Sequence, residues 1–148
     1  AVYFPRYFRG HSGPDRAPNP EWPGLEVGAR MRRVRIRNIT RGGYLAENAG
    51  MATNILTRFR GLMFCKDLPS GEGLVLIPGG QIHMFFMRIP LDVIHADKQG
   101  MVLRVLHGIK PWRLGPMVRK CRIVIELPAG TAARTGTEAG DLIELEDR

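Results

Sequence analysis

Two stretches of the chain carry side chains that could do chemistry. In the first, Arg88 and Asp92 flank Pro90, and in the second, Glu126 stands at the end of an apolar run, two residues before Pro128. Proline fixes φ and lacks an amide hydrogen, so the chain is expected to turn out of a sheet at both places. An isolated charge in a protein interior is very costly, so these charged side chains need partners or a ligand.

A candidate binding site follows when a second guanidinium group is added, and it comprises Arg60, Arg88, Asp92 and Glu126. Two guanidinium groups and two carboxylates can bind a small anionic or carbohydrate ligand, or can divide acid and base roles in catalysis. The competing interpretation is structural, with Arg88 paired to Asp92 or to Glu126. Under that interpretation Glu126 holds a buried ion pair with an arginine of a nearby helix, and its loss destabilises the fold.

A metal site is an alternative for the same corner of the chain. His83 and His95 are symmetric about Ile89, so they face each other if a hairpin is centred there. Asp92 would supply a third ligand, the minimum for an open zinc site. The sequence contains no phosphate-binding glycine loop and no Ser-His-Asp arrangement with a nucleophile elbow, so no cofactor is predicted. The 2 cysteines are too few for a disulfide framework.

The net charge of +8 belongs to the front of the chain, because residues 1–60 hold 11 of the 22 basic side chains and only 4 of the 14 acidic ones. Arg33, Arg35 and Arg37 alternate with apolar residues, which predicts a strand with one basic face. Such a face protects an edge strand against aggregation. It also predicts weak, non-specific polyanion binding, with Tyr44 or Trp112 available to stack on a base.

Short apolar runs separated by turn residues predict a mostly β fold. We expect a compact antiparallel β-barrel or sandwich of about eight short strands with two short helices. The expected helices span residues 54–62 and 131–135, and a hairpin connection is expected at 97–100. The expected strands fall at about residues 33–38, 44–48, 74–77, 82–87, 91–96, 101–107, 122–127 and 141–145.

The chain divides into a short front segment and one domain. Residues 1–30 are rich in proline, aromatic residues and arginine and show no strand or helix period, so they are expected to be a leader or a non-native extension, dispensable for folding. Residues 31–148 are expected to form a single β-rich domain. No apolar run is long enough to span a membrane and no signal peptide is visible, which predicts a cytoplasmic protein.

Five motifs in a fixed order carry a family resemblance. They fall at residues 58–63, 71–74, 82–93, 110–113 and 126–130. The series resembles domain-of-unknown-function family 192, an uncharacterised bacterial and archaeal family, over about residues 33–146. The resemblance implies a compact β-rich fold and no known reaction. Members of that family usually carry an aromatic residue at position 95, so a His83 and His95 pair would be peculiar to this chain, and many members look exported.

The sequence therefore leaves two functions open. It favours a non-catalytic binding or accessory module for a small ligand or a protein. The alternative is an enzyme that acts on a small anionic or carbohydrate ligand at the Arg/Asp/Glu site. The composition, with 44% apolar and 24% charged residues, is that of an ordinary globular domain and excludes a wholly disordered or fibrous protein.

Overall fold

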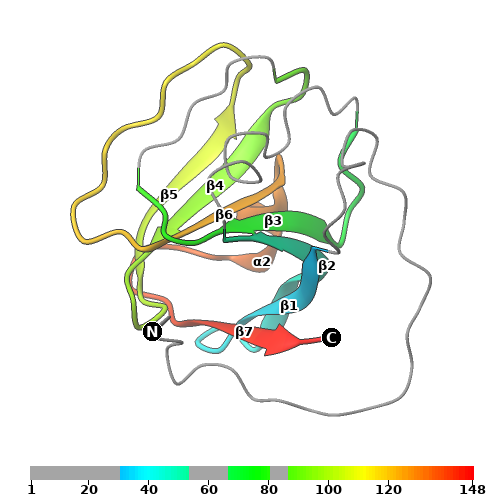
Figure 1. Ribbon diagram of the computed structural model, residues 1–148, viewed down its shortest axis with the longest axis vertical. Helices are drawn as coiled ribbons and strands as arrows, with labels where there is room; N and C mark the ends of the chain where they lie inside the picture. The colour runs from blue at the N-terminus through cyan, green and yellow to red at the C-terminus, as the bar shows by residue number, and fades with distance from the viewer. Residues whose placement is uncertain (1–30, 54–66, 81–86) are drawn as a thin grey trace.

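The computed structural model describes residues 31–53, 67–80 and 87–148. These ranges form one curled sheet of seven strands and one short helix (Figure 1). The elements in chain order are β1 (Arg32–Asn38), β2 (Gly43–Ala52), β3 (Glu72–Leu76), β4 (Leu91–Ala96), β5 (Val102–Ile109), β6 (Ile123–Pro128), α2 (Thr131–Thr135) and β7 (Ile143–Asp147).

The strand order across the sheet is β5-β4-β6-β3-β2-β1-β7. All seven strands belong to this one sheet, so the predicted sandwich is wrong. The expectation of a wholly antiparallel sheet is also wrong, because β2 and β3 run parallel. The chain between them extends from residue 53 to residue 71, which is long enough for the crossover that a parallel pair requires.

The sheet curls into a half-barrel, and its two edges meet only at one end. The Val102 amide donates to the Asp141 carbonyl oxygen at 2.8 Å, and the Ile143 amide donates to the Gly100 carbonyl oxygen at 2.9 Å. Gly100 has a φ of +89°, and a Cβ there would collide with the Ile143 carbonyl oxygen. The predicted closed barrel is therefore wrong, since β5 and β7 are bridged by these few bonds and not by a full ladder.

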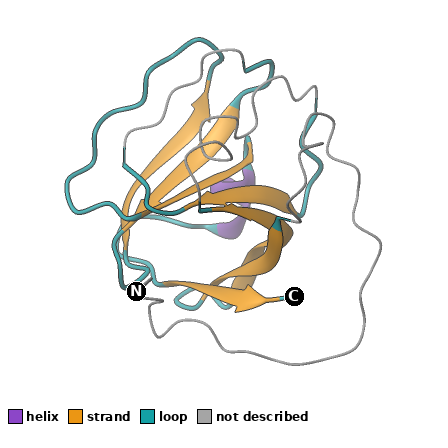
Figure 2. Cartoon of the chain, viewed as in Figure 1, coloured by secondary structure: helices purple, strands orange, loops and turns teal. Residues whose placement is uncertain are grey.

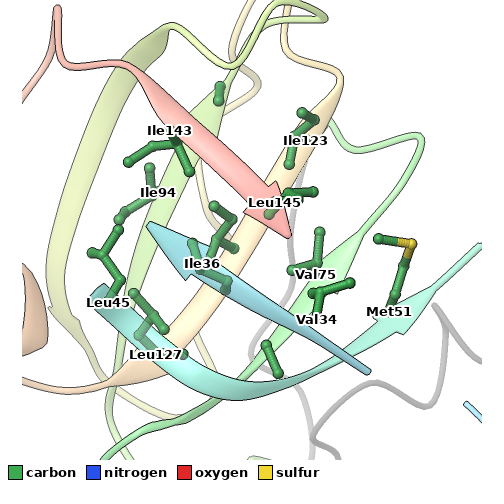
Figure 3. Packing of buried hydrophobic residues seen from close by; sticks show 14 of the residues in the cluster. Val34, Ile36, Leu45, Met51, Val75, Ile94, Ile123, Leu127, Ile143 and Leu145 are labelled. Carbon is green, nitrogen blue, oxygen red and sulfur yellow. The ribbon is translucent and has the colours of Figure 1, made fainter. Parts of the chain in front are cut away.

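The main core lies on the concave side of the sheet, here called the inner face (Figure 3). Every strand contributes buried side chains to it, among them Val34, Leu45, Val75, Ile94, Val102, Ile125 and Leu145. The convex side, here called the outer face, carries a second buried cluster that includes Leu74, Val93 and Val124. Successive side chains of a strand point to opposite faces, so both faces of β4 and β6 are buried.

Several expected elements are confirmed. Helix α2 spans Thr131–Thr135, as the sequence predicted, and packs against β2 and β5 (Figure 2). The connection at 97–100 is a tight turn in which the Asp97 carboxylate accepts hydrogen bonds from the amides of Gln99 and Met101. The predicted helix at 54–62, nearly all of the predicted strand at 82–87 and the front segment 1–30 lie outside the described residues.

Strand β1 is not the edge strand that its arginines predicted. It pairs with β2 on one side and with β7 on the other, so β7 is the edge. Glu146 of β7 lies on the basic face of β1, 3.3 Å from Arg35 and 3.8 Å from Arg37. Arg32, which alternates with these arginines, forms a two-pronged ion pair with Asp147. The alternating arginines of β1 therefore lie beside acidic side chains of a neighbouring strand.

No helix among the described residues is long and apolar enough to cross a membrane.

Candidate functional site

The pairing of β4 with β6 decides which of the predicted site residues can meet. In this antiparallel register Asp92 lies opposite Leu127, and Glu126 lies opposite Val93. Directly paired residues share a face, and neighbours along a strand point to opposite faces. Asp92 therefore belongs to the inner face and Glu126 to the outer face. The two carboxyl groups cannot belong to one site, and the predicted four-residue cluster is wrong in this respect.

Asp92 is a fully satisfied structural residue. Its Oδ1 accepts a hydrogen bond from the Gly108 amide at 2.8 Å, and its Oδ2 accepts one from the Ala132 amide at 2.9 Å. The second bond caps α2, whose own N-cap residue is Gly130 and offers no side chain. Asp92 thus ties β4 to β5 and to the helix, and its side chain is fully buried.

Glu126 is buried on the outer face, with only 6% of its surface exposed. Leu74 of β3 lies opposite it on one side and Val93 of β4 on the other. No hydrogen bond or ion pair joins its carboxyl group to another described residue. Burial raises the pKa of Glu126 from 4.5 to about 7, because apolar surroundings disfavour the charged form.

His95 lies on the same outer face, two residues along β4 from Val93, the residue opposite Glu126. It is fully buried and sits opposite Val124, which places it diagonal to Glu126 at a typical spacing of about 7–8 Å. Neither ring nitrogen has a hydrogen-bond partner within the described ranges. Burial lowers the pKa of His95, and the positive charge of Arg104, directly opposite on β5, lowers it further.

The pair combines unused hydrogen-bonding capacity with apolar surroundings. Near neutral pH a large share of Glu126 is protonated and His95 is uncharged, so each group can both donate and accept a hydrogen bond. Their neighbours on this face are Leu74, Val93 and Val124. A small number of convergent polar groups within an apolar lining is the usual composition of a small-molecule site.

The other predicted site residues do not join this pair. Arg88 is exposed, and no ion pair connects it to Asp92 or Glu126 in the part of the chain that the structure describes. Trp112 is 60% exposed in the connection between β5 and β6. Arg60 lies outside the described residues, so the predicted ion pair between it and Glu126 stays a prediction.

Asp92 cannot be the third ligand of the predicted metal site. Asp92 faces away from His95 and uses both carboxylate oxygens on backbone amides. His83 lies outside the described residues. Within the ranges that the structure covers, no three side chains of histidine, cysteine, aspartate or glutamate are grouped to hold an ion.

The positive charge on the basic face of β1 is partly neutralised by Glu146 of β7. Arg35 and Arg37 both lie near the Glu146 carboxylate, at 3.3 Å and 3.8 Å. Their guanidinium groups also lie over the Tyr44 ring, at 5.7 Å and 6.0 Å from its centre. Tyr44 therefore stacks on arginines of its own chain. Weak polyanion binding through Arg33, Arg35 and Arg37 stays a prediction, and any anion must compete with β7.

One buried polar cluster escaped the sequence analysis. The Asn38 side-chain amide donates to Thr137 at 3.0 Å and to Asp141 at 2.9 Å, and Arg41 donates to both carboxylate oxygens of Asp141. Burial alone would raise the pKa of Asp141, but the hydrogen bonds from Arg41 and Asn38 outweigh it and lower that pKa. The available signal was Asn38 itself, a polar residue in the apolar row of β1. This cluster is fully partnered and closes the half-barrel.

Comparisons with known proteins agree on the family and the fold. The family model of DUF192, described as an uncharacterized ACR, matches residues 37–145. A UPF0127 protein of Pyrococcus furiosus is 32% identical over 114 residues, which are 72% of this chain and 94% of the relative. A UPF0127 protein of Thermococcus kodakarensis is 35% identical over 112 residues, which are 73% of this chain and 71% of the relative.

The fold is similar to that of a solved protein of unknown function from Novosphingobium aromaticivorans. The TM-score is 0.70 at 24% sequence identity, over 90% of this chain and 99% of that chain. The motif-based resemblance is thereby confirmed. These relatives and the solved structure support no specific function.

Proposed function

The chain belongs to domain-of-unknown-function family 192, and from this starting point we propose that it is a non-catalytic binding module whose ligand site is the outer-face pair of Glu126 and His95. The observation that carries the proposal is that Glu126 is buried with no partner among the described residues. Buried polar groups in folded proteins are nearly always hydrogen-bonded, because an unpaired one costs free energy. A bound ligand could supply the hydrogen-bond partner that the Glu126 carboxyl group lacks.

His95 supports the proposal independently. The two buried ring nitrogens of His95 have no hydrogen-bond partner within the described ranges, which costs folding free energy on the same face as Glu126. Two neighbouring groups with the same deficit indicate a shared missing partner. In the buried cluster of Asn38, Arg41 and Asp141, by contrast, the polar side chains bond one another.

The proposed ligand is a neutral, hydroxyl-rich small molecule of the carbohydrate type. Hydroxyl groups both donate and accept, which matches a partly protonated carboxyl beside a neutral imidazole. The C–H surface of a sugar ring would pack on the aliphatic side chains of Leu74 and Val93. An anionic ligand fits less well, because Arg88 is exposed and forms no ion pair with Glu126 in the described part of the chain.

A titration of the full chain with simple sugars tests this proposal. Glucose, galactose and arabinose are added to isotopically labelled protein, with phosphate and acetate as anionic comparisons. We expect saturable NMR shifts for outer-face residues of β4 and β6 with at least one sugar and not with the anions. Glu126→Met and His95→Leu should each abolish the response, while the exposed-site control Glu47→Gln should retain it. Saturation by phosphate or acetate alone would contradict the proposal.

An enzyme is the second candidate, because a pKa of about 7 suits Glu126 for general acid–base catalysis at neutral pH. Glycoside hydrolysis ordinarily needs two carboxyl groups on either side of the bond. Asp92 cannot be the second one, since it faces the inner side. Release of nitrophenol from nitrophenyl glycosides, with a pH dependence lost in Glu126→Gln, would favour the enzyme over the binding module.

A further inference from the structure

The connection between β5 and β6, residues 110–122, carries the most exposed apolar side chains of the described chain. Trp112 is 60% exposed, Leu114 61% and Met117 77%, whereas the other exposed large apolar residues, Ile39, Tyr44 and Met101, are only 39–40% exposed. Scattered apolar residues on a surface need no explanation, but here three strongly exposed apolar side chains occur within six positions of one loop. We call the whole connection, residues 110–122, the 110–122 loop.

The same loop is strongly basic. It contains five cationic side chains and no acidic one: Lys110, Arg113, Arg119, Lys120 and Arg122. All five are exposed, and none forms an ion pair with another residue in the described ranges. The arginines of β1 differ in this respect, because β7 supplies them with carboxylates. The positive charge of the 110–122 loop is therefore available to an external partner.

The loop also has the position and backbone of a projecting element. It follows β5, the outermost strand on its side of the sheet, and runs along the outer margin of the molecule (Figure 1). Trp112 and Lys120 have φ values of 62° and 64°, the only positive φ values of non-glycine residues in the described chain. Bulky residues adopt this conformation at a cost, so the surrounding backbone holds the loop in an unfavourable but defined shape.

We propose that the 110–122 loop docks the protein on an anionic lipid surface. Tryptophan prefers the boundary between lipid headgroups and acyl chains, where its ring is half in an apolar medium. Leu114 and Met117 would enter the apolar layer beside it, while the surrounding lysines and arginines contact lipid phosphates. The absence of any acidic side chain in the loop makes its charge complementary to a negative membrane.

A nucleic acid is the less suitable partner. Single-stranded DNA and RNA are held on several aromatic side chains that stack with successive bases. The 110–122 loop offers one aromatic residue, Trp112, and two aliphatic ones. Aliphatic side chains contribute to insertion in lipid but not to base stacking. The residues that carry this proposal, Trp112, Leu114 and Met117, are not those of the proposed ligand site, so either proposal can fail without the other.

Co-sedimentation of the full chain with vesicles tests the proposal. We expect binding to phosphatidylcholine vesicles that contain phosphatidylglycerol and none to phosphatidylcholine alone. Replacing Trp112, Leu114 and Met117 together by serine should weaken binding at least about tenfold. The matched control Ile39→Ser with Met101→Ser removes exposed apolar side chains elsewhere and should leave binding unchanged.

The cationic contribution is measured separately. Lys110→Gln with Arg113→Gln should weaken vesicle binding roughly fivefold per charge, and the control pair Lys98→Gln with Arg134→Gln should have a much smaller effect. Unchanged melting temperatures would show that the loop variants fold normally. Equal sedimentation of the loop variants and their controls would overturn the proposal. So would a loop-dependent affinity for an oligothymidylate probe without any for the anionic vesicles.

Discussion

Asp92 and Glu126 are buried carboxyl groups on neighbouring strands, yet the chain treats them in opposite ways. Both oxygens of Asp92 accept hydrogen bonds from backbone amides on the inner face. Glu126, almost directly across the strand pair but on the outer face, has no such partner among the described residues, and its burial raises its pKa to about 7. The Asp92 carboxyl group stabilises the fold through two hydrogen bonds, whereas burial of the Glu126 carboxyl group costs folding free energy.

The contrast extends to the whole of each face. The inner face and its closing cluster contain Asn38, Asp92 and Asp141, all of them hydrogen-bonded. The outer face contains His95, whose two ring nitrogens have no hydrogen-bond partner in the described chain, and Glu126, whose pKa is raised by burial. Stability therefore depends on polar groups of the inner face, and unsatisfied polar groups of the outer face are candidates for function. Functional sites commonly carry such local costs.

The largest effect is expected at Asp92. Asp92→Ala leaves the buried amide of Ala132 and the half-buried amide of Gly108 without acceptors, which should cost about 1–3 kcal/mol of unfolding free energy for the first and less for the second. Urea denaturation measures the loss. Asp92→Asn keeps one acceptor and should cost clearly less. If Asp92→Ala were as stable as the parent, the structural role of the inner face would be wrong.

The second effect is stabilisation by Glu126→Gln. A carboxyl group whose pKa rises from 4.5 unfolded to about 7 folded stabilises the fold most below pH 4.5, and this contribution is lost as the pH rises through 7. At pH 8 the lost free energy is about 3 kcal/mol, whereas at pH 5 it is below about 1 kcal/mol. Glu126→Gln should recover it, raising the urea midpoint at pH 8 and scarcely at pH 5.

The opposite result at this position is equally informative. Lower stability of Glu126→Gln at pH 8 would show that a cation, such as the predicted Arg60, holds the carboxylate in its charged form. The double variant with Arg60→Met would then show strong coupling, since a pair in contact gives non-additive changes. Additive changes would exclude that pair.

A smaller effect is expected at His95, with the opposite pH dependence. Burial lowers the pKa of His95, so its neutral form contributes stability above its unfolded pKa of 6.5, and this is lost as the pH falls below that value. His95→Leu removes two unpaired ring nitrogens and should stabilise the protein by about 1 kcal/mol at neutral pH. The gain should increase at pH 5. Thermal unfolding at both pH values is the measurement, and a loss of stability at both would contradict the account.

Local patterns in the sequence predicted local structure well. The apolar runs located the strands, and the alternation in β6 separated Ile123, Ile125 and Leu127 from Val124, as the two buried clusters confirm. Cys121 is also buried but belongs to the outer cluster, because it precedes the start of β6 and the strand alternation does not extend to it. The turn at 97–100 was also predicted from neighbouring residues, and Asp97 does bond the amides of Gln99 and Met101. Helix α2 was predicted in the same way, although its first turn is capped by the distant Asp92.

The site could not be predicted because it depends on pairing between distant strands. Asp92 and Glu126 were each recognised as important, but a shift of register by one residue decides whether they share a face. Nothing in either strand alone states that Glu126 lies opposite Val93. For the same reason the basic strand β1 was expected at an edge, since its partner β7 comes from the far end of the chain.

The most direct test of the account is the titration of the Glu126 carboxyl group itself. The carboxyl carbon shift of Glu126, assigned by comparison with Glu126→Gln, is followed by NMR from acid to alkaline pH in the full chain. We expect a midpoint near pH 7, because burial without a charged partner raises the pKa of a carboxyl group. A midpoint at or below 4.5 would show a paired, structural carboxylate and would contradict the assignment of the outer face to ligand binding.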